Sequence, residues 1–187
     1  MRSARTLAVF LSICLSAVFA EQIVPRQSPE FVIDYPGGKQ ALLSNYKGKV
    51  VVLAFIQTTC PHCQATCQML SKLNTELGAK GFQPLAVAVN AMALMLVNDF
   101  TRDYKVNFPV GASERDPMLN YVQINGAERW VVPQLVLIDR KGIIRKQTPP
   151  LGDEKMQEEN SLRQQIESLL QESSTTKRAG APKKRPT

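Results

Sequence analysis

The segment TTCPHCQATC, residues 58–67, gathers the residues of this chain that are best suited to chemistry. It holds three of the four cysteines and the only histidine, at Cys60, His62, Cys63 and Cys67. Two cysteines separated by two residues can close a small disulfide, and the thiolate form of a cysteine is the species that attacks another disulfide. Cys60 and Cys63 are therefore predicted to form a reversible dithiol that exchanges disulfides with other molecules.

A strand followed directly by a helix is expected to hold this segment. The β-branched apolar run at 48–56 is typical of a strand buried on both faces of a sheet. Apolar residues then recur every three or four positions over 61–77, which predicts a helix with the cysteines in its first turns. They are Cys63, Cys67, Leu70, Leu73 and Leu77.

The start of this predicted helix has consequences for reactivity. Cys60 would lie at the helix N-terminus and Pro61 in the first turn, where a missing N–H costs nothing. The unpaired N–H groups and the positive end of the helix dipole favour a thiolate at Cys60. A protonated His62 would add positive charge beside it. Cys60, Pro61, His62 and Cys63 are thus the candidate catalytic residues.

The rest of the chain alternates strands and helices. Two short strands joined by a tight turn are expected around residues 30–43, further buried strands at 84–89 and 133–139, and helices at 91–104 and 154–170, the last with Leu162, Ile166, Leu169 and Leu170 on one stripe. This order predicts an α/β domain with a central sheet that helices cover on both faces.

The N-terminus has the layout of a secretory signal. Arg2 and Arg5 precede an uncharged, mostly apolar run at 7–19, and Val18 and Ala20 are small residues that suit a cut after Ala20. The run is shorter than the ~20 residues of a membrane-spanning helix, so an uncleaved anchor is the alternative. We expect a signal at 1–20, a linker at 21–29, a folded domain at 30–172 and a disordered basic tail at 173–187.

The charge of the chain is concentrated at its two ends. Seven basic residues account for the formal net charge of +7, and they are Arg2, Arg5, Lys177, Arg178, Lys183, Lys184 and Arg185. The predicted domain is therefore neutral, which gives no indication of a nucleic-acid partner, and membrane contact would be at most peripheral. Removal of the signal would also remove Cys14 and leave Cys60, Cys63 and Cys67 in one segment, where no pairing could staple distant parts of the fold.

Residues 28–170 resemble the extracytoplasmic thioredoxin-like proteins of the TlpA/ResA group, which are related to the AhpC/TSA proteins. The matching pieces are SPEFVIDYPGGKQALLSNYKGKVVVLAF, CPHC at a helix start and VVPQLVLIDRKGIIR. The resemblance implies a thioredoxin fold with a mixed sheet, an N-terminal hairpin and a strand–helix insertion between the CPHC helix and a cis-proline. That proline would be Pro133 after Val132, and both would bind substrate.

The resemblance also implies an activity. It implies an exported, periplasmic or extracytoplasmic thiol–disulfide oxidoreductase that acts on protein thiols and disulfides with an unidentified redox partner, and that uses no cofactor or metal. Three positions depart from the pattern. Thr59 stands where many relatives have tryptophan, and Ala54 and Thr66 stand where a buried acid assists the second cysteine. Because CPHC with Val132 also resembles DsbA-type oxidants, the direction of electron flow is open.

Two other functions fit part of the same segment. Cys63 and Cys67 have the C-x-x-x-C spacing of Sco-type copper proteins, and copper(I) favours thiolates, but the distant histidine of those proteins has no counterpart here. A peroxiredoxin-type peroxidase normally carries P-x-x-x-T-x-x-C, and the corresponding positions here are Leu53 and Gln57. Cys67 itself lies on the apolar stripe and is expected to be a buried core residue.

Overall fold

The computed structural model describes residues 23–179, with only the helical backbone described for 173–179. The predicted signal at 1–20 and residues 180–187 lie outside the described residues. The eight strands are β1 (Arg26–Gln27), β2 (Val32–Tyr35), β3 (Lys39–Leu42), β4 (Val50–Ile56), β5 (Phe82–Ala88), β6 (Val110–Ala112), β7 (Gln134–Ile138) and β8 (Ile143–Gln147). The helices are α1 (Pro61–Leu77), α2 (Ala93–Asp103), α3 (Arg115–Tyr121), α4 (Glu154–Gln157) and α5 (Glu159–Ala179), with short 3-10 helices at η1 (Leu43–Tyr46) and η2 (Gly78–Lys80).

All eight strands form one mixed sheet in the order β1-β8-β7-β4-β5-β6-β2-β3. The central strand β4 runs parallel to β5 and antiparallel to β7. All seven residues of β4 are buried, because layers of side chains cover both faces of the sheet. The long β-branched run therefore formed the strand that its composition predicts.

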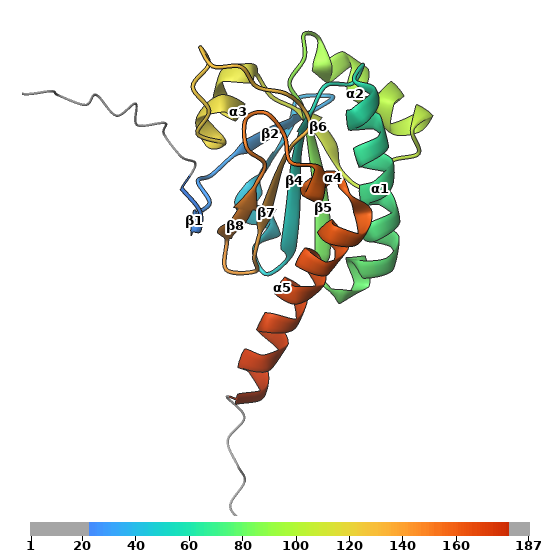
Figure 1. Cartoon of the computed structure of the whole chain (residues 1–187). Coiled ribbons are helices and arrows are strands. Elements are labelled where there is room, and N and C mark those ends of the chain that lie inside the picture. Colours follow the sequence, from blue (N-terminus) through green and yellow to red (C-terminus); the bar gives the residue numbers. More distant parts are fainter. Residues whose placement is uncertain (1–22, 180–187) are drawn as a thin grey trace, which may run out of the picture.

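Helices cover one face of the sheet more fully than the other (Figure 1). On the first face, α1, α2, α4 and α5 contribute apolar side chains to one core cluster together with alternate residues of β4. On the second face, α3, η1 and the segment around Phe31 pack against the remaining β4 residues. These layers confirm the predicted thioredoxin fold with a mixed sheet between helices.

The predicted N-terminal hairpin and the predicted insertion lie side by side. β2 and β3 pair antiparallel around a turn in which Gly37 and Gly38 have positive φ, and β2 pairs with β6 of the insertion. At Gly111 in β6, an added Cβ would lie 2.7 Å from the carbonyl oxygen of Asp34. Glycine at this position thus allows the hairpin to approach the sheet closely.

The chain ends of the domain differ from the prediction. The predicted linker at 21–29 contains β1, which pairs with β8 because Arg26 anchors it through hydrogen bonds to the Tyr121 carbonyl (2.6 Å) and Gln147 Oε1 (3.0 Å). The last helix is divided in two, since Glu158 has an extended backbone between α4 and α5. α5 then continues into the predicted disordered tail as far as Ala179, because neither glycine nor proline interrupts residues 159–179.

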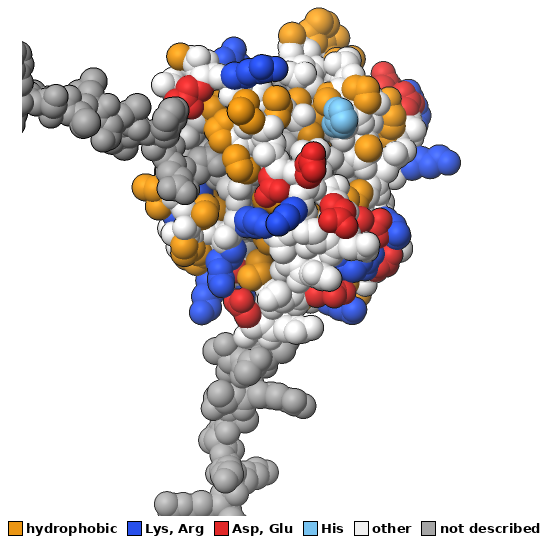
Figure 2. All heavy atoms as spheres, in the orientation of Figure 1, with side chains coloured by type: hydrophobic (Ala, Val, Ile, Leu, Met, Phe, Trp, Pro, Cys, Tyr) orange, Lys and Arg blue, Asp and Glu red, His pale blue; other side chains and the backbone are white. Residues whose placement is uncertain are grey.

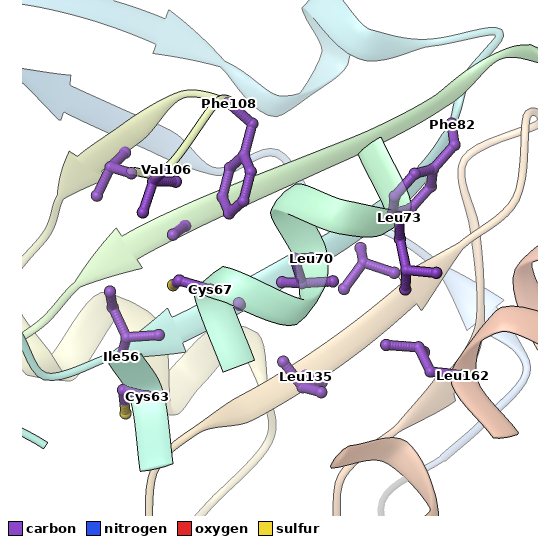
Figure 3. Packing of buried hydrophobic residues seen from close by; sticks show 14 of the residues in the cluster. Ile56, Cys63, Cys67, Leu70, Leu73, Phe82, Val106, Phe108, Leu135 and Leu162 are labelled. Atoms are coloured by element: carbon purple, nitrogen blue, oxygen red, sulfur yellow. The ribbon is translucent and has the colours of Figure 1, made fainter. Parts of the chain in front are cut away.

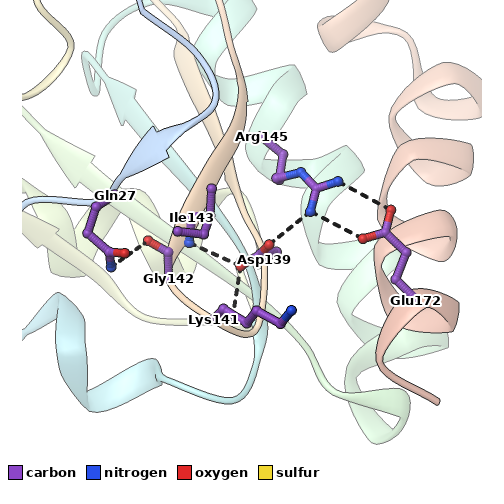
Figure 4. Close-up of polar contacts among 7 residues, drawn as sticks. All are labelled: Gln27, Asp139, Lys141, Gly142, Ile143, Arg145 and Glu172. Atoms are coloured by element: carbon purple, nitrogen blue, oxygen red, sulfur yellow. Dashed lines mark hydrogen bonds and ion pairs between the residues drawn. The ribbon is translucent and has the colours of Figure 1, made fainter. Parts of the chain in front are cut away.

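An ion-pair network fastens α5 to the edge of the sheet (Figure 4). Asp139 Oδ1 accepts hydrogen bonds from the backbone N–H groups of Lys141 (2.8 Å) and Ile143 (3.0 Å) and so shapes the turn between β7 and β8. Its other oxygen lies 3.0 Å from Arg145 Nη1, which is 3.2 Å from Glu172 Oε2.

None of the helices within residues 23–179 combines the length and the apolar character that a membrane crossing would need.

Candidate active site

Cys60 lies at the junction between β4 and α1. It is the N-cap of α1, with an extended backbone (φ −87°, ψ 119°), and Pro61 occupies the first helical turn as predicted. The Cys60 side chain makes no capping hydrogen bond and is partly exposed. Cys60 is therefore partly accessible at the N-terminal end of a seventeen-residue helix, the end that carries positive partial charge.

Cys63 lies on the sheet-facing side of the first turn of α1 and is fully buried. The backbone N–H of Gln57 lies 3.5 Å from its sulfur. Burial raises the pKa of the Cys63 thiol far above its ordinary value, and the nearby thiols of Cys60 and Cys67 raise it further, while the Gln57 N–H acts in the opposite direction. The two cysteines of the predicted dithiol thus interact, and they differ in access to solvent.

Cys67 follows one turn later and is a core residue. It is fully buried, and burial raises the pKa of its thiol to about 12. Figure 3 shows Cys63, Cys67 and Leu70 on the side of α1 that packs toward the sheet, near Ile56 of β4. The expectation that Cys67 belongs to the apolar stripe is confirmed.

His62 occupies the opposite side of this first turn. Its side chain is exposed, and Figure 2 shows the single pale blue histidine at the surface with apolar side chains around it. Ala54, at the position of the buried acid of thioredoxin, and Thr66, at that of the acid in many TlpA/ResA proteins, are both buried and carry no carboxyl group. The titratable side chains that act on Cys63 are consequently the other two cysteines.

The register of the sheet brings Pro133 to the same edge as Cys60. The peptide bond between Val132 and Pro133 is cis, as predicted, and β7 begins with the next residue, Gln134, which pairs with Phe55 near the end of β4. Since β4 leads from there into the loop before Cys60, the cis-proline segment and the dithiol share one end of the sheet. Val132 and Cys60 both pack, partly buried, against the cluster beneath α1.

Two polar residues of this edge were missed by sequence reasoning. Asn90, after β5, accepts a hydrogen bond from the backbone N–H of Thr58 at 2.9 Å and donates to the Thr58 hydroxyl at 3.1 Å. The other is Gln134, whose side chain is completely buried. Both residues stand at the end of an apolar run that forms a strand. This position could have indicated a place near the dithiol, because the ends of neighbouring strands meet at one edge of the sheet.

The copper alternative lacks a ligand set in the part of the chain that the structure describes. Within residues 23–179, no three His, Cys, Asp or Glu side chains come together in a group that could hold a metal ion. Cys60 and Cys67 both lie near Cys63, but Cys67 is enclosed by the core.

Comparisons with known proteins agree with this architecture. The sequence is 29% identical over 123 residues to the thiol-disulfide oxidoreductase ResA of Geobacillus thermodenitrificans. The matched region covers 66% of this chain and 67% of the relative. A structure from Bacteroides thetaiotaomicron, provisionally named a protein disulfide isomerase, superposes with a TM-score of 0.67 at 27% identity over 83% of this chain and 94% of its own.

A second solved structure extends the likeness to nearly the whole of another protein. It comes from Chlorobium tepidum, is provisionally named thiol:disulfide interchange protein DsbE, and has a TM-score of 0.64 at 26% identity, covering 80% of this chain and 99% of its own. The model of the AhpC/TSA family matches residues 24–147. Because this match spans well over half of the sequence and contains the dithiol and the cis-proline, the chain belongs to the AhpC/TSA family.

Proposed function

We propose that this protein is a thiol–disulfide oxidoreductase that exchanges disulfides with protein substrates through Cys60 and Cys63. The observation that carries the proposal is the asymmetric pair at the start of α1, in which Cys60 is partly exposed at the helix N-terminus and Cys63 is buried in contact with it. The names of the ResA and DsbE relatives describe the same class of reaction.

The reaction consists of two thiol–disulfide exchanges. The Cys60 thiolate attacks one sulfur of a substrate disulfide, which forms a mixed disulfide and releases the other substrate sulfur as a thiolate that takes up a proton. Cys63 then loses its proton and attacks the Cys60 sulfur, which releases the second substrate thiol and leaves the Cys60–Cys63 disulfide. Two electrons pass from the dithiol to the substrate, and the reverse sequence oxidises a substrate dithiol.

Residues around the dithiol have supporting roles in this proposal. Pro61 starts the helix at a position where its missing backbone N–H leaves no helical hydrogen bond unmade. His62 contributes positive charge beside Cys60 when it is protonated. The backbone at Val132 and Pro133 would hold the substrate as an added strand, since an extended peptide can pair with exposed backbone groups. The protein partners are accordingly those that present a cysteine or disulfide in an extended segment.

Cysteine variants test the proposal. We expect Cys60→Ser to abolish exchange with insulin, because the attacking thiolate is lost, and Cys63→Ser to accumulate mixed disulfides at Cys60 that mass spectrometry identifies. Cys67→Ala is the matched control, since it also removes a buried thiol of α1 but leaves the dithiol intact. His62→Ala should retain exchange and make the disulfide less oxidising in glutathione buffers. Full activity of both Cys60→Ser and Cys63→Ser would overturn the proposal.

We also propose that the protein is exported and works outside the cytoplasm. The support is the basic, then apolar, then small-residue pattern of residues 1–20, together with the use of a dithiol that can persist as a disulfide in an oxidising compartment. The redox partner that returns the Cys60–Cys63 pair to its starting oxidation state would be met in the same compartment.

A further inference from the structure

We propose that Gln134 is a positioning residue whose buried amide shapes the backbone of residues 131–133 for the incoming substrate strand. The inference rests on the proposed function and adds a residue to it. Gln134 directly follows the cis-proline and is the only polar residue of β7 (Gln134–Ile138), a strand that is buried throughout. Its polar side chain therefore lies in an apolar environment, where burial of a polar group costs free energy unless the group is hydrogen-bonded.

The Gln134 amide connects two loops through three carbonyl groups. Its Nε2 donates to the carbonyl oxygen of Val131 at 2.8 Å, of Pro150 at 3.1 Å and of Pro149 at 3.2 Å. An amide nitrogen carries two hydrogens, so at least one of them is shared between acceptors. The side chain thus draws residue 131, before the cis-proline, onto the loop that follows β8.

The orientation of the amide is set by these carbonyls. Gln134 Oε1 is buried and has no hydrogen-bond partner among the described residues. The reversed orientation would place this oxygen against three carbonyl oxygens, which offer no donor. Burial of an unpaired oxygen is unfavourable, and it accompanies the three hydrogen bonds that the amide nitrogen donates. The three carbonyl groups to which its nitrogen donates explain why a glutamine occupies this position.

The loop that receives Gln134 is itself well anchored. The backbone N–H of Thr148 bonds to the Leu135 carbonyl at 2.9 Å, and the N–H of Gly152 bonds to the Pro149 carbonyl at 2.9 Å. Val131 adds a backbone bond of its own, from its N–H to the Pro150 carbonyl at 2.9 Å. The amide of Gln134 therefore acts between a fixed support and the segment that precedes the cis-proline.

This arrangement leaves one residue available to a substrate. Both backbone polar groups of Val131 face the protein, since its carbonyl accepts from Gln134 and its N–H donates to Pro150. Val132, by contrast, makes no backbone hydrogen bond with any other residue of the range 23–179. With Val131 held in place, the N–H and carbonyl of Val132 remain free to pair with an extended peptide whose disulfide lies over Cys60.

The test compares a polypeptide disulfide with a small one. In Gln134→Met the side chain keeps its length but loses the donors, so we expect the KM for insulin to rise about tenfold, which corresponds to ~1.4 kcal/mol. The rate with cystamine, a small disulfide without a peptide backbone, should remain within about twofold of the wild type. Both reactions are measured on the full chain, and the KM and kcat for insulin are determined separately.

Gln147→Met is the matched control. Gln147 is also buried and also donates through Nε2 to a backbone carbonyl, that of Val122, but it lies outside the cis-proline segment. We expect its substitution to leave the preference between insulin and cystamine unchanged. A parallel fall with both substrates in Gln134→Met, or an unchanged KM for insulin, would overturn the inference. Failure of the wild type to exchange either disulfide would instead contradict the proposed function.

A second variant covers the case in which Gln134→Met does not fold. Gln134→Thr suits a strand and places a short hydroxyl donor at this position, which cannot reach all three carbonyls. The same selective rise in the KM for insulin is expected, together with faster hydrogen exchange at the Val131 N–H. Equal losses toward insulin and cystamine in this variant would again overturn the inference.

Discussion

The three cysteines of α1 have the same chemistry and different surroundings. Cys60 is partly exposed at the N-cap of α1, whereas Cys63 and Cys67 are enclosed by the core. Removal of water disfavours the charged thiolate, so both buried thiols have raised pKa values. In the proposed reaction, this difference in access makes Cys60 the attacking cysteine and Cys63 the resolving cysteine.

The raised pKa of Cys67 predicts a loss of stability at alkaline pH. The folded-state pKa is about 12, above the unfolded value of ~8.5, so the unfolded state ionises first as the pH rises. The contribution of this thiol to stability is complete below pH ~8.5 and declines above it, at up to ~1.4 kcal/mol per pH unit. Denaturant unfolding from pH 8 to about 9.5, with Cys60 and Cys63 joined as a disulfide, measures this slope.

Cys67→Ala provides the control for this measurement. It removes the titrating thiol and leaves a smaller apolar side chain in the core, so its unfolding free energy should be lower overall but less dependent on pH over the same range. Tyr121 also has a raised pKa, to about 12, but in the unfolded state it ionises near pH ~10. Identical slopes for the wild type and Cys67→Ala would contradict the assignment.

At the scale of elements, the site depends on how the β4–α1 connection is held. Thr58 is buried in this connection, and its backbone N–H bonds to Asn90 Oδ1 at 2.9 Å. Asn90 comes from the loop between β5 and α2, and its own amide also bonds to the Ala91 carbonyl at 3.1 Å. A single side chain therefore ties together two loops at the edge where Cys60 lies.

Asn90→Ala is expected to destabilise the fold and to slow exchange. The variant leaves the buried N–H of Thr58 without its acceptor, which costs about 1–3 kcal/mol, and the loop before Cys60 is less restrained. Urea unfolding and the rate of insulin reduction measure the two effects. Asn125→Ala is the control, because Asn125 also accepts from a backbone N–H, that of Ala127, but is exposed; its cost should stay within ~0.5 kcal/mol. Equal effects of the two substitutions would refute the role of Asn90.

At the scale of the whole molecule, the first described strand lies close to the predicted signal cut. β1 (Arg26–Gln27) pairs with β8 at the edge of the sheet, and Ser28 continues this contact through a backbone bond to Gly142 at 2.9 Å. A cut after Ala20 would preserve these contacts. The folded domain of an exported form is therefore expected to be the same as that of the full chain.

Export predicts a mature chain that begins at Glu21. Mass spectrometry of the secreted protein should find this N-terminus, and its unfolding midpoint should equal that of the full chain, because the contacts described for β1 are with β8, Tyr121 and Gln147, all of which the mature chain retains. Ala20→Leu is the control, since a bulky side chain before the cut impairs processing. Recovery of an uncut wild-type chain only from the cytoplasm would refute export.

Much of the fold and the dithiol could be predicted from local patterns. The apolar spacing of residues 61–77 predicted the helix that α1 forms, and the run at 48–56 predicted β4. In contrast, β6 and α3 were not located residue by residue, because segments of three and seven residues are too short for a periodic signal. Likewise β1, within the predicted linker, is a strand only because β8 is there to pair with it.

The sequence by itself determined the helix α1 and the buried strand β4 before it, and it indicated the pair of cysteines proposed to react, because these features depend on residue types a few positions apart. Only the tertiary structure decided which groups surround that pair. Thr58 and Asn90 meet across 32 positions, and Gln134 bonds to a carbonyl group 16 positions away. Contacts at such separations arise from strand order and register, which no local pattern of residues specifies.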